Sequence, residues 1–418
     1  MYNKHLKLKL SILLSLVLCL TPLLSACGTG GAAGSGKGAE SITAGVDPSR
    51  TDLSMEETMI VKSLMAEGNN YRLKKVIEKA RAGEDVTLGF IGGSITEGYN
   101  AGTTEIYAKL VYDFFCENYG TGSNVHYVNA GLSGTPSSLG LLRSDRDLFA
   151  QQPDLIFIEF AVNDSNSVTD TTGYESLIYK ALSQENNPAV ILLMSVIESG
   201  YTCQDNMNMY GFQYDLTRIS VKNAIWPYIE DGSITWDTWS NDESHPNTWG
   251  HSMYASFITD YLLKADAAPM DAEYTFEPHF VKTFNHSTEI MIDRSMNQDA
   301  ITITSPGSFS EVGDLPSFNH GWKHNADAGN DAFTFTYTGQ ALYLVYKDTN
   351  NATYGTAEVY IDGEYAVSLY GNSSDGWYNP VIECIHREKT SGTHTVEIRM
   401  KDDSLDKNFS ILALGLVP

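Results

Sequence analysis

The sequence is poor in basic residues, in cysteine and in long apolar runs, and each shortage excludes a class of protein. Lys and Arg together number 27 in 418 residues, against 52 Asp and Glu, which gives a formal net charge of −25 at pH 7. A chain with this charge repels phosphate backbones, so we expect no nucleic-acid partner. Five cysteines without C-x-x-C spacing are too few for a disulfide framework and do not indicate a structural metal.

The one long apolar run lies at the N-terminus. Three lysines precede residues 10–24, which are almost wholly apolar, and this is the order found in a secretory signal peptide. The run ends in Leu-Ser-Ala before Cys27, which resembles the bacterial lipobox, where the cysteine is lipidated. We therefore expect a lipoprotein signal peptide over 1–26, and a lipidated Cys27 with a flexible Gly-rich tether over 27–51. The protein would then be held by lipid on the outside of a bacterial membrane.

The rest of the chain has an ordinary globular composition, with 42% hydrophobic residues, and divides into two regions. In residues 52–268, apolar runs of strand length alternate with amphipathic segments, which is typical of a parallel sheet covered by helices on both faces. Two short helices are expected within 53–82. The other expected helices are 105–117, 136–150, 173–183, 216–228 and 248–263, and the expected strands are 86–91, 125–128, 155–160, 189–196 and 233–235.

Residues 272–418 are rich in Gly, Asn, Asp, Ser and Thr and show no helical periodicity. The pair Asp362-Gly363 between two alternating runs predicts a two-residue hairpin turn. We expect a separate β-sandwich domain. Its expected strands are 300–304, 332–337, 341–346, 357–361, 365–369, 393–399 and 410–417.

Four short blocks in the first region carry polar residues at positions that suit chemistry. Ser94, preceded by two glycines, follows the first main strand; Gly134 and Asn163 follow the second and third. Asp242 and His245 stand just before the last helix. Because parallel strands end at one edge of a sheet, where open α/β folds bind ligands, we expect these residues to lie together.

The residue types in these blocks suit acyl transfer. An Asp three residues before a His can accept the imidazole Nδ1–H, which leaves Nε2 to take a proton from a serine. Ser94, Asp242 and His245 are therefore candidates for a catalytic triad. The unobstructed N–H of Gly134 and the side-chain amide of Asn163 are candidate donors to an oxyanion.

With these blocks in this order, the sequence resembles the SGNH (GDSL-type) hydrolases over about residues 84–265. The resemblance implies a flavodoxin-like three-layer α/β/α fold, followed here by the C-terminal all-β sandwich. It implies a serine esterase with Ser94 as nucleophile, His245 as general base and acid, and Asp242 as its orienting carboxylate. It also implies an oxyanion hole made by Ser94, Gly134 and Asn163, without any cofactor or metal. The usual Gly-Asp-Ser and Gly-x-Asn-Asp motifs read Gly-Gly-Ser and Ala-Val-Asn-Asp in this chain.

The substrate is a further expectation. The layout of an exterior hydrolase with an added β-sandwich is similar to that of bacterial esterases that deacetylate polysaccharides, so we expect an acetylated oligo- or polysaccharide as partner. Trp236, Trp239, Trp377 and Tyr378 are candidate substrate-binding aromatics, because they lie close to the Asp-His block or in a polar loop. The histidines other than His245 are expected to be structural or exposed.

Two other readings stay open. An O-acetyltransferase or a lipid esterase would use the same three residues with another acceptor or acyl chain. A surface glycan-binding lipoprotein without activity would not need Ser94, Asp242 and His245 to be intact, as they are here. The sequence does not indicate an oligomeric state.

Overall fold

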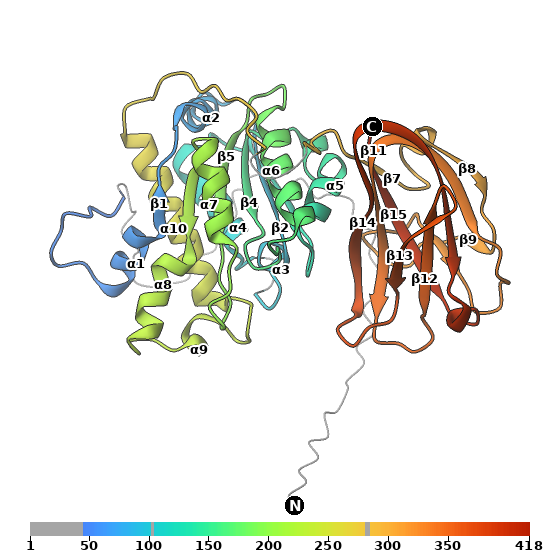
Figure 1. The fold of residues 1–418 in the computed structure, drawn as a ribbon. Coiled ribbons are helices and arrows are strands. Elements are labelled where there is room, and N and C mark those ends of the chain that lie inside the picture. Colours follow the sequence, from blue (N-terminus) through green and yellow to red (C-terminus); the bar gives the residue numbers. More distant parts are fainter. Residues whose placement is uncertain (1–44, 102–103, 281–284) are drawn as a thin grey trace, which may run out of the picture.

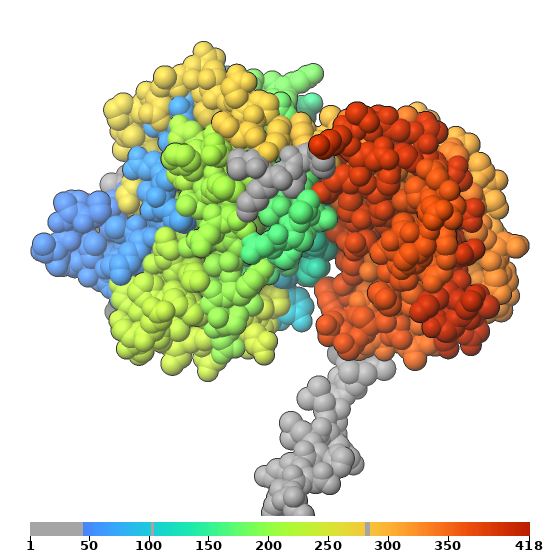
Figure 2. All heavy atoms as spheres, viewed as in Figure 1, coloured from blue at the N-terminus to red at the C-terminus, as the bar shows by residue number. Residues whose placement is uncertain are grey.

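The computed structural model describes residues 45–101, 104–280 and 285–418. The expected signal peptide, the lipidated Cys27 and most of the tether lie outside these residues. Figures 1 and 2 show two lobes in contact: an α/β domain built from the first part of the chain and a β domain built from the last part. Within the described residues, no helix combines the length and apolarity that crossing a membrane requires.

The α/β domain is built on a six-stranded sheet in the order β1-β6-β5-β4-β2-β3. Five strands are parallel, and the short β1 pairs antiparallel with β6 at one edge. If the five parallel strands are numbered along the chain, their order is 2-1-3-4-5, the flavodoxin-like arrangement. The strands are β1 (Leu64–Ala66), β2 (Val86–Gly92), β3 (Val125–Gly131), β4 (Leu155–Glu159), β5 (Ala189–Met194) and β6 (Thr217–Ser220).

Helices cover both faces of this sheet, which is why its central strands are mostly apolar. Strands β2, β4 and β5 are completely buried. One core lies under α1 (Met55–Ser63), α2 (Tyr71–Arg81), α4 (Tyr107–Tyr119), α8 (Val221–Glu230), α9 (Trp236–Trp239) and α10 (Thr248–Ala267). The other lies under α5 (Ser137–Asp147), α6 (Val168–Leu182) and α7 (Gln204–Gln213). The expected three-layer α/β/α fold is confirmed.

Two expected elements of this domain are wrong. Residues 233–235 do not form a strand, because the N–H of Ile234 bonds back to the carbonyl of Tyr228 and closes a turn after α8. The fifth parallel strand is β6, which occupies the start of the segment expected to be the helix 216–228. That helix begins only at Val221, where the Ser220 side chain caps it.

The β domain is all antiparallel. Its strands follow the order β13-β12-β14-β11-β15-β10-β9, with β7 paired to β15 and β8 paired to β11. The first half of β11 pairs with β8 and its second half with β15, so this one strand serves two parts of the sheet. The strands are β7 (Ile290–Ile292), β8 (Ile301–Ser305), β9 (Phe309–Glu311), β10 (Trp322–His324), β11 (Phe333–Thr349), β12 (Thr356–Ile361), β13 (Glu364–Tyr370), β14 (Trp377–Met400) and β15 (Phe409–Val417).

The hairpin predicted at Asp362-Gly363 is present between β12 and β13, with positive φ at both residues. The runs expected at 332–337 and 341–346 merge into the single strand β11. The predicted domain start at 272 falls too early in the structure: Tyr274 is packed into the second core of the α/β domain and its hydroxyl donates to the Tyr214 carbonyl at 2.5 Å. The first strand of the β domain begins at Ile290.

The two domains meet along α5. Leu139 and Leu142 of this helix are fully buried in an apolar cluster with Met291, Tyr343 and Leu412 of the β domain. Polar contacts border the cluster, since the Lys180 ammonium donates to the Glu289 carbonyl at 3.1 Å and the His286 N–H donates to the Ser176 hydroxyl at 2.9 Å. An interface of this kind fixes the β domain next to the carboxyl edge of the sheet.

Candidate active site

Ser94 stands where β2 ends and the short helix α3 (Ser94–Glu97) begins. The chain turns sharply here because two glycines precede it. A Cβ on Gly93 would lie 2.1 Å from Oδ1 of Asn163, and one on Gly92 would lie 2.5 Å from the Glu159 carbonyl oxygen. Ser94 is only 8% exposed, so its hydroxyl is held in one environment rather than free in solvent.

His245 lies against this serine. Its Nε2 is 2.9 Å from the Ser94 hydroxyl, a hydrogen-bond distance. Its Nδ1 is 2.9 Å from Oδ2 of Asp242 and 3.1 Å from Oδ1. With Nδ1 protonated by this contact, Nε2 is left as the acceptor toward the serine. The three residues predicted as a triad are thus joined in one hydrogen-bonded chain.

Asp242 is itself fixed by its own loop. Its Oδ1 accepts from the backbone N–H groups of Ser244 at 2.8 Å and His245 at 2.7 Å, and its Oδ2 accepts from the Asn100 amide at 2.8 Å. Partial burial opposes ionisation, but these backbone bonds and the His245 imidazole outweigh it and hold the pKa of the carboxyl below its usual value. The charge needed to orient and stabilise an imidazolium is therefore present at neutral pH.

A cavity of about 430 Å³ opens in front of the serine, within the range of small-molecule sites. It brings together every residue predicted for the triad and the oxyanion hole. Tyr99 forms part of its wall, with its ring centroid 4.5 Å from that of His245. The cavity is lined by Ser94, Ile95, Tyr99, Ser133, Gly134, Val162, Asn163, Ile197, Asp242, Ser244, His245 and Trp377.

The β domain contributes one wall of this cavity through Trp377, the first residue of β14. Its indole lies so close over Gly134 that a Cβ at that position would be 2.6 Å from Cζ2 of the ring. Gly134 also has φ +66°, a conformation that favours glycine. Trp377 nevertheless remains 54% exposed, so part of its ring is available to a ligand.

Three of the four aromatic residues expected to bind substrate do not line the cavity. Trp239 is 0% exposed and Trp236 is 7% exposed, and both rings are packed into the core under α10. Trp236 instead holds the loop of Asp242 and His245, because its indole N–H donates to the Asp242 carbonyl at 2.6 Å. Tyr378 has φ +72° and falls at a register shift between β14 and β11, and its side chain contacts Asn351 and Lys347.

Two buried charged residues near the serine turn escaped sequence analysis. Arg143 of α5 is 1% exposed and donates to the Gly92 carbonyl at 3.2 Å. Glu159, at the end of β4, is 0% exposed and accepts from Ser195 at 2.5 Å and Thr96 at 3.2 Å; burial raises its pKa. A single glutamate closing a wholly apolar strand is the signal that would have indicated Glu159. Arg143 begins the charged C-terminal part of α5, so the sequence does not mark it as buried.

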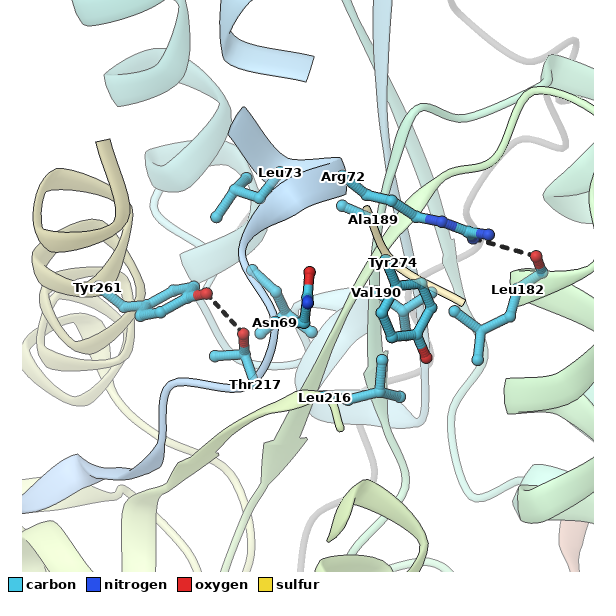
Figure 3. Close-up of a pocket in the computed structure, with 11 residues that line it drawn as sticks. Asn69, Arg72, Leu73, Leu182, Ala189, Val190, Leu216, Thr217, Tyr261 and Tyr274 are labelled. Atoms are coloured by element: carbon cyan, nitrogen blue, oxygen red, sulfur yellow. Dashed lines mark hydrogen bonds between the residues drawn. The ribbon is translucent and has the colours of Figure 1, made fainter. Parts of the chain in front are cut away.

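A second pocket lies away from this site, between α2, the ends of β5 and β6, and the segment around Tyr274 (Figure 3). Figure 3 shows Arg72 directed to the Leu182 carbonyl, at 3.0 Å, and Tyr261 paired with Thr217. Its volume is about 20 Å³, which holds one water. It is therefore too small for a substrate, and the polar side chains of Arg72, Thr217 and Tyr274 already have partners within the protein.

Comparison with known proteins agrees with this geometry. Residues 90–253 match the model of the GDSL-like Lipase/Acylhydrolase family. An arylesterase of Vibrio mimicus is 23% identical over 177 residues, which cover 42% of this chain and 86% of that protein. A crystal structure of a two-domain esterase (CEX) active on acetylated mannans superposes with a TM-score of 0.76 at 26% identity, covering 85% of this chain and 97% of that one. The same esterase co-crystallized with mannopentaose gives a TM-score of 0.75.

Proposed function

Since residues 90–253 match the GDSL-like Lipase/Acylhydrolase family, we propose that this protein is an esterase that removes acetyl groups from carbohydrates. The observation that carries the proposal is the hydrogen-bonded chain from Ser94 through His245 to Asp242 at a cavity whose wall includes Trp377 of the β domain. The first part of that arrangement suits ester hydrolysis, and the second suits a sugar ring.

The reaction we propose is acyl transfer in two steps. His245 Nε2 takes the proton of the Ser94 hydroxyl as the oxygen attacks the acetyl carbonyl, and a tetrahedral oxyanion forms. His245 then gives the proton to the departing sugar oxygen, which leaves an acetyl-serine. A water molecule repeats the attack with His245 as base, so acetate leaves and Ser94 regains its proton.

Stabilisation of the oxyanion is assigned to the N–H groups of Ser94 and Gly134 and to the Asn163 side-chain amide, all three at the cavity. We expect Asn163→Ala to lower kcat by about 10²- to 10³-fold with a much smaller change in KM, because the contact forms with the developing charge. Steady-state kinetics on an aryl acetate measure this split. A rise in KM of this size, with kcat unchanged, would contradict the role of Asn163 in stabilising the oxyanion.

The carbohydrate assignment draws on the β domain. A tryptophan that is half exposed and faces the cavity offers an apolar ring on which a sugar can stack. The two-domain relative acts on acetylated mannans and was crystallized with mannopentaose. An acetylated mannan is therefore our first choice of substrate for this chain. A neutral glycan also suits a protein with formal charge −25 better than an acidic one does.

Trp377→Ala is expected to separate binding of the glycan from chemistry. We expect KM for an acetylated oligosaccharide to rise by about tenfold or more, since loss of a stacking partner costs on the order of 1 kcal/mol or more. Hydrolysis of a small aryl acetate should change little, because the triad does not contact this ring. Tyr378→Ala, at the neighbouring residue outside the cavity, is the matched control and should affect neither substrate.

Acetate release from a panel of acetylated mannan, xylan, pectin and peptidoglycan tests the proposed function. The highest kcat/KM on acetylated mannan supports it, and no release from any glycan refutes the carbohydrate assignment. Activity that rises with acyl chain length would indicate a lipid esterase. Acetyl transfer to a sugar acceptor in place of hydrolysis would indicate the O-acetyltransferase. Binding of mannan with no turnover would indicate the glycan-binding lipoprotein.

We also propose that the protein works outside the cell, anchored through lipid on Cys27. The proposal is supported by the charged and apolar order of residues 1–26 and by the residues that precede Cys27. Fractionation of cells that express the Cys27→Ser variant tests it. Loss of the protein from the membrane fraction is the expected result, and unchanged membrane association of that variant contradicts lipidation at this cysteine.

A further inference from the structure

An irregularity in β14 brings two histidines of the β domain side by side. Arg387 pairs with Ala341 of β11 and Gly392 pairs with Gly339, so residues 388–391 are left without partners in β11. This bulge shortens the path between His386 and His394, whose ring centroids are 4.4 Å apart. Regular strand geometry would separate residues eight apart by about 26 Å.

The Nε2 atoms of both histidines face one carboxylate, that of Glu388. Nε2 of His386 is 3.3 Å from Oε1 of Glu388, and Nε2 of His394 is 3.8 Å from the same atom. One ligand atom from each residue lies within 4.8 Å of the others. Donor atoms around a tetrahedral zinc ion, with bonds of roughly 2.1 Å, are about 3.4 Å apart. The spacing of the three side chains therefore suits a metal ion between them.

The surroundings of Nε2 of His394 give independent evidence for a ligand at this place. This atom is buried and has no hydrogen-bond partner among the described residues. Buried polar atoms are normally satisfied, so an orphaned nitrogen next to a carboxylate that stands too far for a hydrogen bond calls for a ligand. Gly392 keeps the space beside it open, since a Cβ there would lie 2.7 Å from this nitrogen.

The opposite nitrogen of each ring is already held. Nδ1 of His394 is 2.8 Å from Oδ2 of Asp362, in the β12–β13 turn, and Asp362 is fixed in turn by the Thr395 N–H at 2.8 Å. Nδ1 of His386 is 2.5 Å from the hydroxyl of the buried Tyr337. Metal-binding histidines typically carry such outer partners, which fix the tautomer and aim Nε2 at the ion.

We propose that His386, Glu388 and His394 bind a zinc ion. Two imidazoles and a carboxylate are ligands that zinc accepts, and they leave one position for water. Glu388 is 41% exposed, which gives the ion a path from solvent. Bound there, the ion would tie the bulge of β14 to the turn between β12 and β13. This site departs from the sequence-based expectation of no metal, and it does not depend on the proposed esterase function.

Isothermal titration of tag-free, chelator-treated full-length protein with ZnCl₂ tests the site, with thermal unfolding as the second readout. We expect one ion per chain and a higher Tm with zinc. Glu388→Gln changes an exposed side chain and should keep the fold while weakening binding at least tenfold. Asp362→Asn should weaken binding by about 10- to 100-fold through His394 alone.

His320→Gln, at an exposed histidine elsewhere in the β domain, is the matched control and should bind zinc as the wild type does. Ser94→Ala should also bind zinc normally, so failure of the esterase proposal leaves this test intact. Absence of zinc binding by the wild type overturns the proposal. Binding by Glu388→Gln and His394→Gln as tight as that of the wild type overturns it too, because the ion would then lie elsewhere.

Discussion

Ser94→Ala should lower kcat for acetyl ester hydrolysis by about 10⁴- to 10⁶-fold, the largest loss expected from any single substitution in this protein. The substitution removes the proposed nucleophilic oxygen, whose hydroxyl donates the 2.9 Å hydrogen bond to Nε2 of His245. Alanine fills the same space apart from one oxygen, so the fold and Tm should be preserved. Hydrolysis of an aryl acetate by purified protein measures the loss.

Ser133→Ala is the control for this experiment. Ser133 also lines the cavity, but its hydroxyl binds Glu97 rather than the imidazole. Its replacement should retain most of the activity. If Ser94→Ala retained activity close to that of the wild type, the nucleophile would have to be another group, and the mechanism proposed above would be wrong.

Asp242→Asn should lower kcat by about 10⁴-fold, the second largest loss that we expect. The Asp242 carboxylate accepts from Nδ1 of His245 and from two backbone N–H groups. An asparagine amide keeps the shape but turns a donor toward Nδ1, so the proton moves to Nε2 and the imidazole can no longer accept from Ser94. Since the side chains are isosteric, binding of substrate should hardly change.

The control for this variant is Asp237→Asn, an exposed acidic residue of α9 on the same segment. It should show wild-type kinetics. A loss of less than tenfold in Asp242→Asn would show that the carboxylate only shapes the loop. Because the pKa of Asp242 lies below its ordinary value, any loss of wild-type activity between neutral and mildly acid pH must come from another group.

The candidate site residues were predictable because Ser94 and Asn163 follow mostly apolar strands and Asp242 and His245 precede a long helix. Strands such as β2 and β4 are recognisable from composition, and parallel topology then places their ends at one edge. Elements of three or four residues were not predictable. Strands β6, β9 and β10 are too short to show a period, so the sequence pattern does not separate them from turns.

The direction in which side chains point was also not predictable from the sequence. The sequence places Trp236 and Trp239 close to Asp242, yet only tertiary packing decides that both rings face the core. His386 and His394 look unrelated along the chain, because the bulge that joins them depends on the pairing of β14 with β11. Long-range contacts of this kind leave no local pattern.

Helix α5 forms much of the interface between the two domains, and this limits which β domains could follow the α/β domain. Helix α5 begins three residues after Gly134, and its Leu139 and Leu142 lie under the β domain while Trp377 rests over Gly134 itself. The β domain therefore cannot be removed without effect on the α/β domain. Its deletion would expose two buried leucines to solvent and open one side of the cavity in front of Ser94. Another domain can replace this β domain, in evolution or by engineering, only if it supplies an apolar surface that covers Leu139 and Leu142 of α5. It must also place a side chain over Gly134.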